Sequence, residues 1–275
     1  MNEKWSWRLI QLKRRRLRLI KALLNSVASR PGNTQPQTVF IGGIPRSGTN
    51  MVMDVLDQSY ETDVFHESDP RVYSGTAVKN IEILLRYWAG TRAPVIVFKA
   101  ILDSHNIPQW MDLCPPAKCV WIVRNCDDTC RSHVRSFLTT KERLGRAIHG
   151  KEAGPWMLGN LSPSVLKVAQ HHYTPDMSAE SAAALLWYLR HELYFELGLH
   201  KSEDTRILYY DEFVQNPNKG MASLCSFLSI NAKPRMSRDI HAKSMNTRKL
   251  DAIDPAIRKL CEEVWIRVRD QGRFI

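Results

Sequence analysis

Hydrophobic residues fall into short apolar runs separated by segments with helical spacing. The runs 95–99 and 119–124 are apolar without polar alternation, as expected of strands buried on both faces, and 39–41 and 206–210 also predict strands. Helical spacing predicts helices at 50–58, 76–89, 127–140, 180–197, 218–229 and 254–269. Strands that alternate with helices predict an α/β fold of three layers, with a mostly parallel central sheet.

Breaker residues divide the chain into segments. Residues 31–37 are rich in Pro, Gly and Asn, and predict a linker between residues 1–30 and a single domain, 31–275. Residues 141–180 contain seven Gly and Pro residues and are expected to be irregular. They form either a lid or acceptor-binding insertion or an ordinary surface excursion.

Positive charge is concentrated at the start of the chain. The net charge is +11, and residues 1–30 hold nine Lys and Arg against one Glu, or +8, which leaves +3 for the other 245 residues. Apolar residues with near-helical spacing predict a basic amphipathic helix in this segment. These residues are Trp5, Leu9, Leu12, Leu19 and Leu23. Such a helix packs on the body with a solvated charged face, lies on an anionic membrane surface, or binds nucleic acid.

The composition narrows the class of protein. No run of about 18 apolar residues occurs, so no membrane span is expected, and no stretch resembles a secretory signal. The six cysteines lack the spacing of a disulfide framework, so reduced thiols and a cytoplasmic location are expected, either free or peripheral at the inner face of a membrane. Cys126, Cys130 and His133 have ligand-like spacing without a fourth ligand, so a buried helix face is expected there and no metal site.

A phosphate-binding loop is the sharpest local signal. Gly43 and Gly48 have the G-x4-G spacing of a P-loop, between a predicted strand and a predicted helix. Thr49 stands where P-loop nucleoside triphosphatases carry a lysine, and Asn50 stands where they carry the magnesium-binding hydroxyl. The loop is therefore expected to hold a phosphate without a metal, with Arg46 as its cation. The alternative is a tight turn with an exposed arginine.

Two segments resemble sulfotransferases. The stretch from Pro45 to Asn50 is similar to their 5′-phosphosulfate loop, and Arg124 and Ser132 fall on the two phosphate-binding positions of their 3′-phosphate motif, with Cys126 in place of the usual proline. The resemblance implies a P-loop-type fold and 3′-phosphoadenosine 5′-phosphosulfate (PAPS) as donor. The residues implied to bind it are Arg46, Ser47, Gly48, Thr49, Asn50, Arg124 and Ser132.

The same resemblance implies the catalytic groups. Glu67 stands where tyrosylprotein-type sulfotransferases carry their catalytic base, and His66 is the rival base, with a suitable ordinary pKa. Lys99 ends an apolar strand, at the position of the family's catalytic lysine, and is expected to stabilise the departing phosphate together with Arg46. The cytosolic branch carries a histidine where this chain has Ile101, which disfavours a mechanism of that kind.

Further positions and alternatives stay open. The segment around Tyr210 resembles a structural segment of the family, and four later residues are candidates for closing over the nucleotide. These four are Lys243, Ser244, Arg248 and Lys249. A hydroxyl acceptor is expected: a glycan or glycolipid is preferred, and a tyrosine or small molecule is not excluded. The alternatives are a P-loop small-molecule kinase, an inactive nucleotide-binding relative, and a nucleic-acid-binding module, which the confined charge disfavours.

Overall fold

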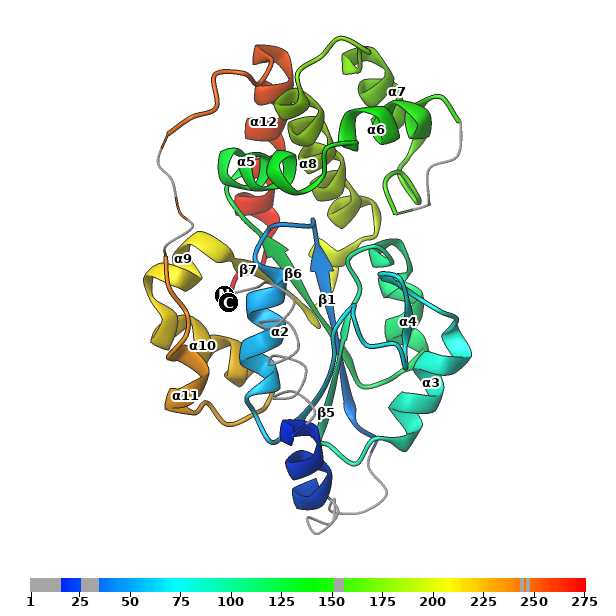
Figure 1. Ribbon diagram of the computed structural model, residues 1–275. Coiled ribbons are helices and arrows are strands. Elements are labelled where there is room, and N and C mark those ends of the chain that lie inside the picture. The colour runs from blue at the N-terminus through cyan, green and yellow to red at the C-terminus, as the bar shows by residue number, and fades with distance from the viewer. Residues whose placement is uncertain (1–15, 26–34, 151–155, 243–244, 246–247) are drawn as a thin grey trace, which may run out of the picture.

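A five-stranded parallel sheet forms the centre of the protein (Figure 1). The computed structural model describes residues 16–25, 35–150, 156–242, 245 and 248–275. The strand order is β2-β5-β1-β6-β7. The strands are β1 (Gln37–Gly43), β2 (Thr62–Phe65), β5 (Val95–Lys99), β6 (Ala117–Val123) and β7 (Thr205–Tyr209). The predicted three-layer α/β fold with a parallel sheet is confirmed.

Successive side chains along each strand point to opposite faces of the sheet and pack into two separate cores. Phe40 and Trp121 point to one face, which is covered by helices that include α3, α4, α8 and α12, whereas Val39 and Ile41 point to the other, which is covered by α2, α9, α10 and α11. The uniformly apolar strands therefore follow from burial on both sides. The helices are α2 (Thr49–Asp57), α3 (Ile81–Gly90), α4 (Ile107–Leu113), α5 (Cys126–Ser136), α6 (Thr140–Ile148), α7 (Pro163–His172), α8 (Ala179–Glu196), α9 (Tyr210–Gln215), α10 (Pro217–Phe227), α11 (Pro234–Ser237) and α12 (Pro255–Gln271).

Three predicted elements are corrected. The helix expected at 76–89 begins only at Ile81, because Asn80 caps it by accepting a hydrogen bond from Ile83 N, and β3 (Tyr73–Ser74) pairs with β4 (Ala77–Val78) before it. The helix expected at 127–140 is two helices, α5 and α6. The segment 141–180 is more regular than expected, since it holds most of α6 and all of α7.

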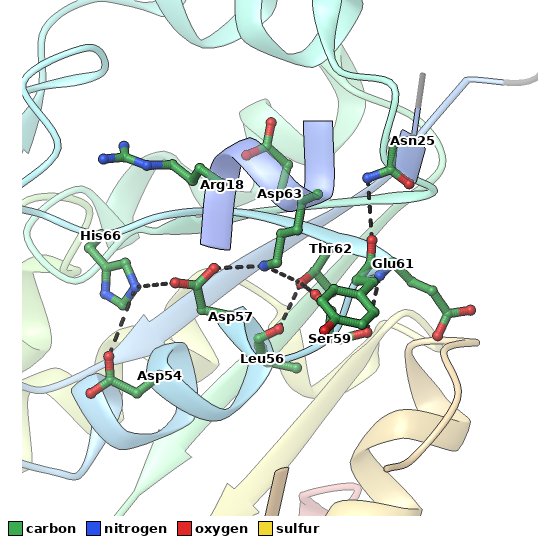
Figure 2. Close-up of polar contacts among 12 residues, drawn as sticks. Arg18, Asn25, Asp54, Leu56, Asp57, Ser59, Glu61, Thr62, Asp63 and His66 are labelled. Atoms are coloured by element: carbon green, nitrogen blue, oxygen red, sulfur yellow. Dashed lines mark hydrogen bonds and ion pairs between the residues drawn. The ribbon is translucent and has the colours of Figure 1, made fainter. Parts of the chain in front are cut away.

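The helix over residues 16–25 packs with an unexpected face inward. Lys21 is 4% exposed and forms an ion pair with Asp57 (Figure 2), whereas Leu19 and Leu23 are each 67% exposed. The alternative in which this helix leaves its charged face in solvent is therefore wrong for the part that the structure describes. Trp5, Leu9 and Leu12 lie outside the described residues. None of the described helices is both long and apolar enough to cross a membrane.

Helix α8 buries a histidine whose protonation state is fixed by its surroundings. His191 is fully buried, its Nδ1 lies 2.6 Å from the Trp187 carbonyl oxygen, and the centres of the His191 and Trp187 rings lie 3.9 Å apart. Burial lowers the pKa of His191 from 6.5 to about 4. The neutral imidazole is therefore the form that the core accepts.

Acid should destabilise the fold through His191. Above pH 6.5 the imidazole is neutral in both states; below it, the unfolded chain takes up the proton and the folded chain resists until pH reaches about 4. Binding of this proton to the unfolded chain lowers the free energy of unfolding by up to about 3 kcal/mol. Urea unfolding across this range should show a flatter pH dependence for His191→Gln than for wild type. His241→Gln, at an exposed position, should keep the wild-type slope; equal slopes for all three proteins would contradict the assignment.

Candidate functional site

The turn from β1 into α2 has the backbone of a phosphate-binding loop. Gly43 and Gly48 have φ values of 129° and 96°, and Arg46 between them has φ 75°. A Cβ atom on Gly43 would lie 2.5 Å from the carbonyl oxygen of Ile122. Buried Ser47 closes the turn by donating from Oγ to the Ile44 carbonyl oxygen at 2.8 Å. The loop therefore requires glycine at both ends, and it leaves the N-terminus of α2 at the carboxyl edge of the sheet.

The two sequence motifs for phosphate meet at this edge. Arg46 is exposed, and its Nε donates to Ser132 Oγ on α5 at 3.1 Å. Arg124, which follows the end of β6, donates to the backbone carbonyl oxygen of Arg46 at 3.3 Å. Two guanidinium groups and one hydroxyl, from segments 78 or more residues apart, thus lie together.

Arg124 is held by groups on both of its sides. Its guanidinium lies 4.7 Å from the centre of the Tyr210 ring, and it pairs with Asp128 at 3.5 Å. The Tyr210 ring also contacts Gly48, where a Cβ atom would come within 2.1 Å of the ring. Tyr210 therefore packs against both the phosphate loop and Arg124, which gives the segment that we expected to be structural a place in the site. Thr49, the first residue of α2, is buried beside this contact.

The predicted base and the predicted cation are in contact. Lys99 Nζ donates to Glu67 Oε2 at 2.6 Å and to Asn50 Oδ1 at 2.7 Å. Lys99 is 4% exposed, and burial lowers the pKa of its ammonium while the charge of Glu67 opposes that shift. Tyr73 fixes the strand ends behind this pair, because its hydroxyl lies 3.0 Å from the Lys99 carbonyl oxygen and 3.2 Å from that of Phe65.

His66 is placed differently from Glu67. Its Nε2 lies 3.8 Å from Asp57 Oδ2 and 3.9 Å from Asp54 Oδ1, both on α2 (Figure 2). It does not line the cavity that Glu67 lines. The geometry therefore favours Glu67 over His66 as the group that meets an acceptor.

A cavity of about 190 Å³ opens beside Glu67. Leu102, Phe137 and Met157 supply apolar walls, and Arg143 of α6 lies at its side, 5.7 Å from the centre of the Trp156 ring. Residues from the segment expected to be an insertion thus line the cavity. The walls are apolar and the carboxylate is at one side, which suits an acceptor group with one reactive hydroxyl.

The cysteine–histidine motif is largely buried, with Cys130 in the core and His133 lining the cavity beside Glu67. His133 Nε2 lies 2.9 Å from Thr140 Oγ1, and burial together with the charge of Arg46 lowers the pKa of His133 to about 4. Cys126 Sγ lies 3.8 Å from Cys130 Sγ. Among the described residues, no group of three or more His, Cys, Asp or Glu side chains could hold a metal ion.

Arg190 is a residue of the site that sequence reasoning missed. It is fully buried in α8 and donates to the carbonyl oxygens of Gly43 at 3.0 Å and Ile101 at 3.0 Å, and also to that of Trp156. Burial lowers its pKa to about 9. A lone arginine inside the apolar run of this helix was the available signal, because a buried cation must find acceptors.

The basic residues near the C-terminus are brought only in part to Arg124. Lys249 and Arg124 both line a cavity of about 160 Å³. Arg248 contributes its backbone carbonyl oxygen, which accepts a hydrogen bond from Arg131 at 2.7 Å. Lys243 and Ser244 lie outside the described residues.

The protein is thus an α/β domain with a P-loop-type turn that gathers two arginines and a hydroxyl at the carboxyl edge of its sheet, an arrangement that is typical of phosphate sites. The model of the sulfotransferase domain family matches residues 36–253. This match covers most of the chain, so the chain belongs to the sulfotransferase family, and this membership supports sulfuryl transfer as its reaction. No curated protein sequence matches the chain.

Solved sulfotransferase structures resemble the chain at low identity. The sulfotransferase domain from the curacin biosynthetic pathway is 15% identical, with a TM-score of 0.49 and coverage of 87% of this chain and 93% of that one. The sulfotransferase from Alicyclobacillus acidocaldarius is 17% identical, with a TM-score of 0.45 and coverage of 89% and 93%. Mouse sulfotransferase SULT7A1 complexed with PAP is 15% identical, with a TM-score of 0.41 and coverage of 86% and 77%.

Alanine at position 48 should destabilise the protein beyond the strain of its backbone. Gly48→Ala combines a positive φ with a Cβ atom 2.1 Å from the Tyr210 ring, so we expect a loss of roughly 2–5 kcal/mol in the free energy of unfolding. Gly198→Ala is the matched control: φ is 67° and no heavy atom lies within 4 Å of the added Cβ, so it should lose only about 1–2 kcal/mol. Urea unfolding measures both, and equal losses would contradict the packing of Tyr210 against the loop.

Proposed function

We propose that this protein transfers a sulfuryl group from PAPS to a hydroxyl acceptor. The observation that carries the proposal is the contact between the two phosphate motifs, in which Arg46 meets Ser132 and Arg124 meets the backbone of Arg46. PAPS carries one phosphate at its 3′ position and a phosphosulfate at its 5′ position. Two neighbouring anion sites are therefore what this donor requires.

The phosphate loop supports a donor that binds without a γ-phosphate. Arg46 and the backbone N–H groups at the start of α2 would hold the 5′-phosphosulfate, with Ser47, Gly48, Thr49 and Asn50 forming the cradle. Arg124 and Ser132 would hold the 3′-phosphate. Asp128 already pairs with Arg124 at 3.5 Å, so a bound phosphate would compete with a carboxylate for this cation.

Glu67 and Lys99 would divide the chemistry between them. The acceptor oxygen attacks sulfur, its proton passes to the Glu67 carboxylate, and the bond from sulfur to the 5′-phosphate oxygen breaks. The electron pair of that bond stays on adenosine 3′,5′-bisphosphate. When Glu67 takes the proton it ceases to be an anionic partner for Lys99, and the ammonium can then turn to the leaving phosphate oxygen together with Arg46.

The cavity beside Glu67 bears on the acceptor. Its apolar walls and the volume of about 190 Å³ suit a group with an apolar face and one hydroxyl, which describes one face of a sugar ring as well as an aromatic alcohol. A glycan or glycolipid acceptor remains our preferred class. Arg143 at the cavity would favour an acceptor that carries a negative group near its hydroxyl.

Replacing the proposed base tests the chemistry. Glu67→Gln keeps the shape of the side chain but cannot take a proton, so the turnover of radiolabelled PAPS with a panel of glycan, phenol and lipid acceptors should fall about 10²–10⁴-fold. Binding of adenosine 3′,5′-bisphosphate should not weaken. Glu82→Gln, an exposed carboxylate in the first turn of α3, is the control and should retain full turnover. Full turnover by Glu67→Gln would place the base elsewhere.

Replacing Arg124 tests the donor site. Calorimetry should show that Arg124→Met weakens the binding of adenosine 3′,5′-bisphosphate about tenfold or more, since a charge-assisted hydrogen bond to phosphate contributes about 1.5–3 kcal/mol. Arg135→Met, on the exposed side of α5, should leave the affinity unchanged.

If wild type binds ATP with magnesium better than the bisphosphate, a small-molecule kinase becomes the better assignment. If it binds the bisphosphate but turns over no acceptor, it is an inactive relative.

A further inference from the structure

The helix over residues 16–25 is attached to the body by its polar side chains. Arg18 donates to Asp69 Oδ2 at 2.9 Å, and Lys21 donates to Asp57 Oδ1 at 2.7 Å (Figure 2). Both acids are buried, so each arrangement withdraws a carboxylate from water and supplies a cation in its place. The contacts of this helix are therefore specific ionic ones.

A third polar contact places the helix along the edge of the sheet. Asn25 Nδ2 donates to the carbonyl oxygen of Tyr60 at 3.2 Å. Tyr60 precedes β2 and Asp69 follows it, so the contacts of the helix extend past both ends of this strand. β2 is an outer strand of the sheet. The helix thus lies along an edge that needs a cover.

The buried ion pair fixes how the helix is rotated. Lys21 is 4% exposed, and burial lowers its pKa while the charge of Asp57 opposes that shift. Burial raises the pKa of Asp57, but the neighbouring His66 and the ion pair with Lys21 outweigh this and hold the pKa below its usual value. A buried pair of this kind contributes little net stability, but it allows one orientation only.

That rotation turns an apolar stripe outward. Leu19 and Leu23 are 67% exposed, Leu24 is 44% exposed and Ile20 is 39% exposed. These four residues, the outer apolar stripe, adjoin one another on successive turns of the helix. A helix that packs on a protein in water normally shows the opposite arrangement, and a continuous exposed apolar surface marks a site of interaction.

The charge around the stripe identifies what would cover it. Residues 1–30 hold nine Lys and Arg and one Glu, a net charge of +8, and among the described residues of this segment Arg18 and Lys21 pair with acids of the body. Arg16 is exposed one turn before Leu19 and Ile20. Apolar side chains flanked by basic ones match an anionic bilayer, whose acyl boundary takes the leucines while its headgroups attract the cations.

We propose that the helix over residues 16–25 docks the protein on an anionic lipid surface, and that the Lys21–Asp57 pair holds the outer apolar stripe toward the lipid. In Figure 1 this helix lies at the bottom, whereas the phosphate loop after β1 lies in the upper half. The helix is therefore a different surface from the phosphate loop.

Sedimentation of the full chain with lipid vesicles tests the docking surface. Wild type should bind vesicles of phosphatidylcholine mixed with phosphatidylglycerol, bind pure phosphatidylcholine far less, and lose binding as salt is raised. The double variant Leu19→Ser with Leu23→Ser should bind the anionic vesicles about tenfold less, or weaker still, because two leucines no longer enter the interface. Both positions are exposed, and circular dichroism verifies that the variant is folded.

Ile266→Ser is the matched control, since Ile266 is an apolar residue of α12 that is 57% exposed and lies outside the helix. It should bind the anionic vesicles as wild type does. The proposal is overturned if the double variant binds as wild type does, or if wild type binds neutral vesicles equally well. It is also overturned if the double variant binds vesicles as wild type does but has lost the binding of an oligonucleotide, or has lost the dimer that wild type forms in sedimentation velocity. None of these measurements depends on sulfuryl transfer, so failure here leaves the proposed function standing.

Discussion

The contact between the buried guanidinium of Arg190 and the carbonyl oxygen of Gly43 is the constraint around which the site is built. A cation without water must be surrounded by acceptors, and the carbonyl oxygens of Ile101 and Trp156 complete the set. These three carbonyls belong to the phosphate loop, to the segment after Lys99 and to the wall of the cavity beside Glu67. The phosphate loop, the segment after Lys99 and the cavity beside Glu67 are thereby joined to one helix, α8.

The same principle governs the catalytic pair. Lys99 is almost fully buried and needs an anion, and the Glu67 carboxylate provides it at 2.6 Å. In the resting protein the two groups neutralise each other, so neither is exposed as an isolated charge. The arrangement couples the proposed roles, because a proton on the carboxylate releases the ammonium for the leaving phosphate.

The N-terminal helix repeats this use of buried charge for another purpose. The Lys21–Asp57 pair fixes the rotation of a helix, whereas the Lys99–Glu67 pair positions groups proposed to react. The leucines of the helix turn outward as a result. The excess positive charge of the chain belongs mainly to residues 1–30, since the other 245 residues carry a net charge of only +3.

The sequence by itself determined the features whose physics is local. Apolar runs predicted β1, β5 and β6, because burial on two faces leaves no polar position, and G-x4-G predicted the phosphate loop, because only glycine accepts its backbone. The four residues of β2 were too few and too polar to be recognised. The tertiary structure alone decided that His66 turns to α2, that Arg190 binds three carbonyls and that Lys21 faces inward. In each case the deciding partner belongs to another element, and the direction of a charged side chain depends on where its counter-charge or acceptor lies after folding.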